Sequence, residues 1–143
     1  MEGYWGPLIR TVSSIDTSIE FMGWKQCREA IGEGVTIGSH SVTHKRLSEL
    51  GNEDATYELV QSKAEIEKNT KQICKHFCAP YGIPGLDFDL IEHAELAGEF
   101  GYKSFATGSR GANRYSQPLH ALQRDHLLAN CSNRQLRYFF SRG

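Results

Sequence analysis

The sequence predicts an α/β fold in which strands and helices alternate around a parallel sheet or barrel. A short β-branched run at 35–37 is followed by a long amphipathic segment at 53–75. An apolar stretch at 76–79 then precedes a helical pattern at 87–99, and a further strand-like stretch follows at 101–107. Alternation of this kind is typical of βα units, whose strands run parallel.

The start of the chain has no clear period. Glycine, proline and a group of serines and threonines interrupt residues 1–20, so we expect an irregular N-terminal segment there and a domain over residues 21–143. A helical repeat predicts a helix over residues 24–31, which Gly32 would end. Residues 35–37 are β-branched and favour a buried strand.

A short helical turn is expected at residues 45–50, before the long helix of residues 53–75. Asn52 is a suitable N-cap for that helix. Its apolar positions recur every seven residues, at Leu59, Ile66 and Ile73. The opposite face carries charged residues such as Glu58, so we expect a helix that lies on a core with this face in solvent.

The second half of the chain continues the pattern with shorter elements. Asp87 can cap a helix that runs to about residue 99, on which His93 is expected to face solvent. Residues 119–128 are predicted to hold a strand. Ser132 or Asn133 then caps a terminal helix.

Composition and charge exclude several classes of function. The chain has 143 residues, of which 39% are hydrophobic and 23% charged, with a formal net charge of −1. This balance gives no electrostatic case for binding nucleic acid or an anionic membrane. No stretch approaches the roughly 18 apolar residues of a membrane span, and the first residues do not resemble a signal peptide.

The four cysteines predict reduced thiols. They lie at positions 27, 74, 78 and 131, do not form a Cys-x-x-Cys motif, and are too few for a disulfide scaffold. We therefore expect a cytoplasmic protein for the sequence as given, although a truncated chain would lack any export signal.

Two histidines mark the most informative stretch. His40 and His44 are four residues apart, and side chains at this spacing share a face if the backbone turns helically between them. A neutral imidazole is a common ligand of divalent transition metals. The spacing alone leaves two possibilities open: a metal site, or two surface histidines on a turn.

The surrounding residues add a family resemblance. Gly-Ser-His-Ser-Val-Thr-His at 38–44 resembles the second motif of the polysaccharide deacetylases, the NodB-homology enzymes of carbohydrate esterase family four. Phe-Cys-Ala-Pro-Tyr-Gly at 77–82 resembles their third motif, and the resemblance extends over residues 20–143. It implies a distorted or incomplete (β/α) barrel that removes acetyl groups from a carbohydrate with a divalent metal, usually zinc.

The resemblance also implies roles for individual residues. His40 and His44 correspond to two ligands of the catalytic metal. The backbone N–H of Tyr81 corresponds to the donor that stabilises the oxyanion of the reaction. Pro80 and Gly82 correspond to the residues that shape this turn and contact the substrate.

Two further roles are assigned less directly. The family often carries a histidine near the end of the domain that protonates the leaving amine, and His126 is our candidate, with His120 as the alternative. Trp24 is a candidate surface on which a sugar ring stacks.

The chain departs from the family in its first motif, which supplies two adjacent aspartates as general base and third metal ligand. The sequence has no Asp-Asp, Asp16 is the only aspartate before His40, and Cys78 stands where many members have arginine. A truncated or divergent member fits these departures. The alternatives are a catalytically inactive carbohydrate-binding or interaction domain, and a metal-free fragment that completes its core as a homo-oligomer.

Overall fold

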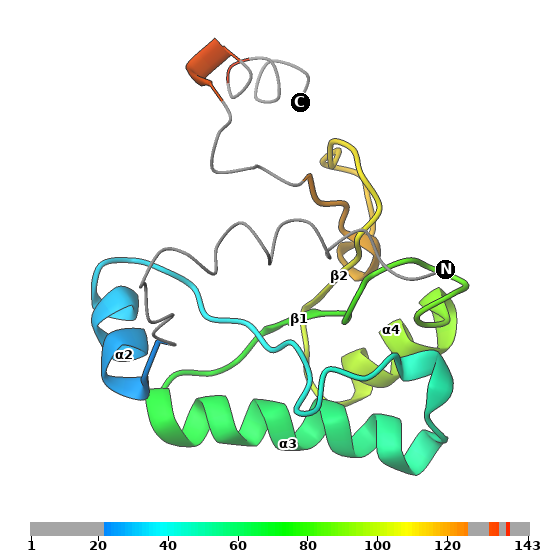
Figure 1. Cartoon of the computed structure of the whole chain (residues 1–143), viewed down its shortest axis with the longest axis horizontal. Coiled ribbons are helices and arrows are strands. Elements are labelled where there is room, and N and C mark those ends of the chain that lie inside the picture. The colour runs from blue at the N-terminus through cyan, green and yellow to red at the C-terminus, as the bar shows by residue number, and fades with distance from the viewer. Residues whose placement is uncertain (1–21, 126–131, 135–136, 138–143) are drawn as a thin grey trace, which may run out of the picture.

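The computed structural model describes residues 22–125, 132–134 and 137. Figure 1 shows helices arranged around short strands at the centre of the described chain. The elements in chain order are α2 (Trp24–Gly32), a 3₁₀ helix η1 (Leu47–Glu49), α3 (Asn52–Thr70), β1 (His76–Cys78), α4 (Leu90–Glu99), β2 (Ser104–Ala106) and a 3₁₀ helix η2 (Leu119–Ala121).

The strands pair in parallel, as the sequence predicts. Phe77 of β1 lies opposite Phe105 of β2 in the centre of the register. Ser39 forms a parallel bridge to Phe77 on one side, and Leu122 forms another to Ala106 on the other. The described residues therefore form a partial α/β structure with parallel strands.

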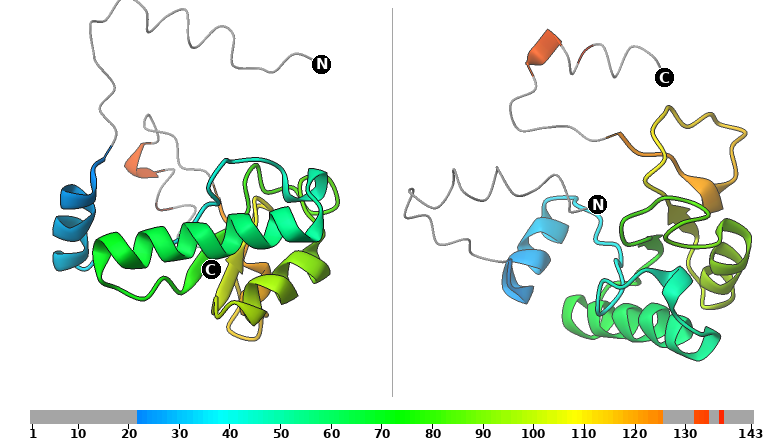
Figure 2. Two further views of the ribbon diagram at one scale, coloured as in Figure 1. Left: turned by 90° about the horizontal axis from the view of Figure 1, so that it is seen from below. Right: turned by 45° about the vertical axis from the view of Figure 1, so that its right-hand side comes forward.

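The core lies between one face of this sheet and the helices. Phe77 and Phe105 project to this face, and their ring centroids are 5.4 Å apart. Both views in Figure 2 place α3 and α4 against the sheet. The buried cluster consists of Leu47, Leu59, Cys74, Phe77, Ala79, Phe88, Ala94, Ala97, Tyr102 and Phe105.

The other face of the sheet carries small or polar side chains. Side chains alternate along a strand, so the neighbours of the two phenylalanines point away from the core. These neighbours line a cavity of about 530 Å³ that also reaches His40. They are His76, Cys78, Ser104 and Ala106.

The predicted buried strand at residues 35–37 is wrong. These residues lie outside the sheet, and Val35 is 51% exposed. Pairing begins only at Ser39, whose N–H donates to the His76 carbonyl over 2.8 Å. Gly38 permits this approach, because a Cβ at that position would lie 2.9 Å from the same carbonyl oxygen.

The long helix differs from its prediction at both ends. Gly51 is the N-cap and Asn52 is the first helical residue, so the expected Asn52 cap is wrong. The helix ends at Thr70, five residues earlier than expected, because Lys71 adopts a left-handed conformation with φ of 59°. Ile73, expected on the apolar face, therefore lies beyond the helix and is 70% exposed.

Several other predictions near the core also need correction. Glu58 and His93 were expected in solvent but are only 4% and 6% exposed, since backbone groups of neighbouring segments satisfy them. Asp89, not Asp87, caps α4 by accepting two backbone N–H bonds. In the described part of the strand expected within 119–128, residues 119–121 form the 3₁₀ helix η2 and Leu122 makes an isolated bridge to Ala106.

Some predictions fall outside the described residues. These are the irregular segment 1–20, the acid candidate His126 and most of the terminal helix. The described cysteines, Cys27, Cys74 and Cys78, are free thiols.

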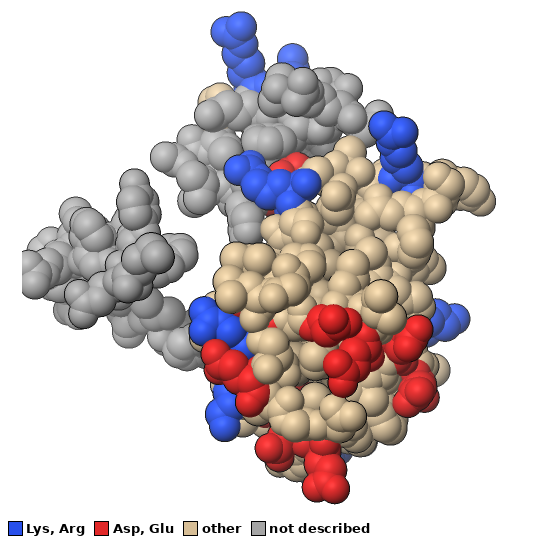
Figure 3. All heavy atoms as spheres, turned by 90° about the vertical axis from the view of Figure 1, so that its right-hand side faces the viewer, with Lys and Arg blue, Asp and Glu red and all other residues tan. Residues whose placement is uncertain are grey.

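The surface and the helices add two observations. No helix in the described part of the chain combines the length and apolar content needed to cross a membrane. On the face drawn in Figure 3, acidic side chains gather toward the lower part and Lys and Arg lie mostly above them.

Phe105→Ala should remove about 3–5 kcal/mol from the free energy of unfolding, because its fully buried ring packs against Phe77 and Phe88 and its loss leaves a cavity there. Phe100→Ala, at a position 37% exposed, is the matched control and should cost clearly less. Urea unfolding followed by circular dichroism measures both. Equal losses would show that the core is not centred on the sheet.

Candidate functional site

The two predicted histidines meet in the structure. The Nε2 atoms of His40 and His44 are 3.1 Å apart, and the ring centroids are separated by 4.8 Å. His40 follows the Ser39 bridge directly, so both rings lie near the carboxyl end of β1. The convergence that the sequence spacing suggested is therefore present.

The backbone reason for this convergence differs from the prediction. Residues 40–44 are not helical; Ser41 and His44 instead adopt left-handed conformations with φ of 69° and 58°. The Ser41 hydroxyl accepts the His44 N–H over 3.0 Å, which closes the turn. Left-handed backbone is uncommon for residues other than glycine, so other contacts must hold this loop in place.

A carbonyl group fixes the protonation of His40. Its Nδ1 lies 2.7 Å from the Cys78 carbonyl oxygen, which can only accept, so Nδ1 carries the proton and Nε2 is the acceptor atom, which faces the His44 Nε2. Desolvation lowers the pKa of His40 below the ordinary value of 6.5, while the Cys78 carbonyl opposes the change. The nearby positive charge of Arg124 lowers it further. Desolvation and the charge of Arg124 thus both favour the neutral ring, which is the form that binds metals.

The pair fits two positions of a metal site. Nitrogen ligands bind zinc at about 2.0–2.1 Å, so two of them in a tetrahedral site lie about 3.3 Å apart. The observed 3.1 Å between the Nε2 atoms is close to this value. Within residues 22–125, 132–134 and 137, however, no three His, Cys, Asp or Glu side chains gather as a metal site.

The predicted Pro80–Gly82 turn lies beside the histidines. The Tyr81 ring centroid is 5.0 Å from that of His44, and the ring is 57% exposed. Tyr81 has a φ of 58°, another left-handed residue. Gly82 is required here, since a Cβ would lie 2.6 Å from the Gly108 nitrogen. The structure thus brings the two sequence motifs together.

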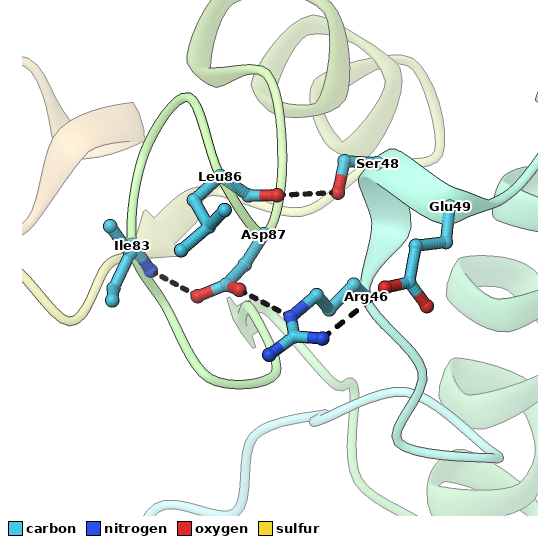
Figure 4. A network of polar contacts seen from close by, with 6 residues as sticks. All are labelled: Arg46, Ser48, Glu49, Ile83, Leu86 and Asp87. Atoms are coloured by element: carbon cyan, nitrogen blue, oxygen red, sulfur yellow. Dashed lines mark hydrogen bonds and ion pairs between the residues drawn. The ribbon is translucent and has the colours of Figure 1, made fainter. Parts of the chain in front are cut away.

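An ion pair connects the histidine loop with this turn (Figure 4). Arg46 Nε donates to Asp87 Oδ1 over 2.7 Å, and Asp87 Oδ2 accepts the Ile83 N–H over 2.8 Å. Asp87 is 1% exposed. The Arg46 guanidinium also stands 4.6 Å from the Tyr81 ring centroid, so it contacts both segments.

Helix α3 contacts the loop from its other side. The carboxylate of Glu58 accepts the backbone N–H groups of Val42 and Thr43 over 2.6 and 2.8 Å, and the Thr43 hydroxyl over 2.5 Å. Burial raises the pKa of Glu58, but these hydrogen bonds outweigh burial and hold it below the ordinary value of 4.5. The carboxylate is therefore charged at neutral pH.

Trp24 and His120, two further candidates from the sequence, are not brought to the pair. Trp24 lies on α2, 42% exposed, and makes no described contact with either histidine. His120 lies on η2 and lines a separate cavity with α4. His126 lies outside the described residues.

Sequence reasoning missed three residues that contact the site. Arg46 and Asp87 are 41 residues apart, and no local pattern connects them. Glu58 lies on the charged face of an amphipathic helix, a pattern that indicates exposure to solvent. Its separation from Thr43 by 15 residues gave no signal of contact.

Fold and site together define the general class of the chain. It is an α/β protein whose paired imidazoles and Pro-Tyr-Gly turn lie at the carboxyl ends of parallel strands, where such folds place their sites. The family model for polysaccharide deacetylase matches residues 9–103, more than half of the sequence. The chain belongs to the polysaccharide deacetylase family.

Solved structures of deacetylases share the fold. The deacetylase PplD of Streptococcus pyogenes, solved with acetate, superposes with a TM-score of 0.72 at 22% identity, covering 90% of this chain and 54% of that one. The Bacillus cereus polysaccharide deacetylase BC0361 gives 0.68 at 16%, covering 92% and 46%. The deacetylase domain of BpsB from Bordetella bronchiseptica gives 0.60 at 20%, covering 77% and 55%.

This chain therefore spans about half the length of the solved structures it resembles. A comparison with curated protein sequences gives no significant match.

The pKa of Glu58 predicts how stability depends on pH. Because the folded pKa is lowered, Glu58 contributes stability above pH 4.5 that is lost as the pH falls through the folded value. The difference in free energy of unfolding between the native chain and Glu58→Gln should thus be larger at pH 6 than at pH 3. Urea unfolding across this range measures it, and a difference that grows on acidification would contradict the assignment.

The ion pair between Arg46 and the buried Asp87 should contribute more to the free energy of unfolding than a similar surface pair. Asp87→Asn is expected to lower the free energy of unfolding by about 1–3 kcal/mol, since a buried carboxylate loses its charged hydrogen bonds. Asp125→Asn is the matched control, because its pair with Arg110 is more exposed and should contribute less than about 1 kcal/mol. Thermal unfolding compares the two, and equal effects would show that the Asp87 network is not stabilising.

Proposed function

We propose that this chain is the metal-binding part of a hydrolase that removes N- or O-acetyl groups from a carbohydrate. The cofactor is a divalent metal, zinc in the first instance, and the substrate is an N-acetylated sugar polymer or glycan. The observation that carries the proposal is the spacing of the His40 and His44 Nε2 atoms beside the Tyr81 turn. Family membership supports the same reaction class.

Each residue has a defined part in this chemistry. A bound divalent cation supplies Lewis-acid polarisation of the acyl carbonyl and activation of water. His40 and His44 hold the cation through Nε2, and the Cys78 carbonyl keeps the His40 proton on Nδ1. The backbone N–H of Tyr81 donates to the oxyanion that develops on the acyl group.

The remaining roles follow the family pattern. Pro80 and Gly82 shape the turn that presents the Tyr81 amide to the substrate. His126 donates a proton to the leaving amine, and Trp24 contributes a stacking surface for sugar.

We further propose that the parallel strands belong to a distorted or incomplete (β/α) barrel. The bridges of Ser39 and Leu122 extend the strand pairing on both sides of β1 and β2, which supports this arrangement. In the family pattern one carboxylate is the third metal ligand and a second is the general base. Among the described residues, no three His, Cys, Asp or Glu side chains gather as a metal site.

The missing Asp-Asp motif favours a second candidate function. In this alternative the chain is a catalytically inactive carbohydrate-binding or interaction domain that keeps the deacetylase fold. Self-association of the chain through an unpaired sheet edge is compatible with either function.

Metal content and activity of the purified chain test the proposal. We expect one equivalent of zinc after dialysis, lost in His40→Ala and in His44→Ala but kept in the control His120→Ala. Release of acetate from N-acetylglucosamine oligomers measures catalysis. Zinc binding without acetate release would favour the inactive domain. Zinc content that is unchanged in His40→Ala and His44→Ala would overturn the metal site.

A further inference from the structure

Glu58 is a buried charged residue to which the proposed chemistry gives no part. It lies on α3, and none of the ion pairs among the described residues includes it. Glu58 is 4% exposed, and both oxygens of its carboxylate accept hydrogen bonds, from three donors of one loop in all. A buried carboxylate is costly unless it is hydrogen-bonded, so its partners explain its position.

Those donors belong to Val42 and Thr43, two of the three residues between the histidines. Oε2 accepts the N–H groups of Val42 and Thr43, and Oε1 accepts the Thr43 hydroxyl. These contacts fix both peptide groups at the middle of the loop. Because Ser41 and His44 are left-handed, the loop would otherwise relax toward more common backbone conformations.

The next turn of α3 holds the entrance of the same loop. The Ser62 hydroxyl lies 2.6 Å from that of Ser39, the residue before His40. Residues 58 and 62 are four apart and share one face of the helix. One face of α3 therefore contacts the chain directly before the first histidine and again between the two.

The arrangement argues against other functions for this carboxylate. Both oxygens are occupied by hydrogen bonds from the loop, and Glu58 forms no three-residue metal cluster with the histidines within the described chain. A glutamine would keep one acceptor oxygen for the two backbone N–H groups and could donate its NH₂ to the Thr43 hydroxyl. It would lose the negative charge that strengthens all three hydrogen bonds.

We propose that Glu58 is a positioning residue of the metal site, which holds the Ser41–His44 loop so that both imidazoles present Nε2 to one cation. The proposal rests on the metal-binding function given above. Partners that orient metal ligands typically change metal affinity by about 10–100-fold when they are removed.

The test compares zinc affinity, measured by competition with a chromophoric chelator, among variants of the full chain. Glu58→Gln and Thr43→Val should each weaken zinc binding by about 10-fold or more, because the first removes the negative charge of the acceptor and the second removes the hydroxyl donor. Thr43→Ser keeps the hydroxyl and should restore affinity to within about 2-fold of native. Glu65→Gln is the matched control, since Glu65 lies on the same helix but contacts Lys68 and Asn69.

A second measurement keeps the test independent of overall stability and of the metal. Ring-to-ring nuclear Overhauser effects between His40 and His44 in the metal-free chain report the loop geometry directly. They should be lost in Glu58→Gln and Thr43→Val and kept in Thr43→Ser, while thermal unfolding confirms that each variant is folded. If Glu58→Gln unfolds, Thr43→Val carries the comparison.

The outcomes separate this proposal from the function on which it rests. Native affinity in Glu58→Gln and Thr43→Val, or retained ring contacts in both, would overturn the positioning role. If the native chain binds no zinc, the metal-binding function fails, and the ring contacts alone decide whether Glu58 positions the histidines. If Thr43→Ser lost as much zinc affinity as Thr43→Val, this would also contradict the positioning role, since the hydroxyl hydrogen bond would then not contribute to metal binding.

Discussion

The bridge between Ser39 and Phe77 is the contact on which the rest of the site depends. The Ser39 N–H donates to the His76 carbonyl, and the Cys78 N–H donates to the Ser39 carbonyl over 2.9 Å. This pairing puts His40 next to the end of β1, where its Nδ1 reaches the Cys78 carbonyl. Two residues further along, the same strand end turns at Pro80 and Tyr81, so one parallel bridge aligns both motifs.

A loop with two left-handed residues is stable here because rigid elements hold it on two sides. Helix α3 contacts it through Glu58 and Ser62, and the Arg46–Asp87 pair holds the segment that follows His44. Backbone conformations of this kind persist where surrounding contacts determine them. The unfavourable conformation and the contacts that hold it are therefore parts of one arrangement.

The sequence predicted the helices and the parallel strands because apolar side chains recur along each element at the helical or strand period, on the side that packs on the core. It also identified the histidine pair and the Pro-Tyr-Gly turn, since these are short motifs. It failed where tertiary contacts override the local pattern: Glu58 follows a solvent-face pattern but is buried by the loop it binds. The strand predicted at 35–37 failed similarly, because pairing begins at Ser39, where Gly38 allows close approach.

Charge sets the limit on what the described site can do alone. Two neutral imidazoles add no negative charge to offset a dication, and Arg124, held by the Thr107 carbonyl over 2.7 Å, adds a positive charge to the cavity beside His40. An anionic ligand would stabilise a cation placed there further, as in sites that combine two histidines with a carboxylate. Binding of cation and carboxylate must then be coupled, and by linkage each raises the affinity for the other. The preorganised pair supplies geometry, and the charge has to come from a further group.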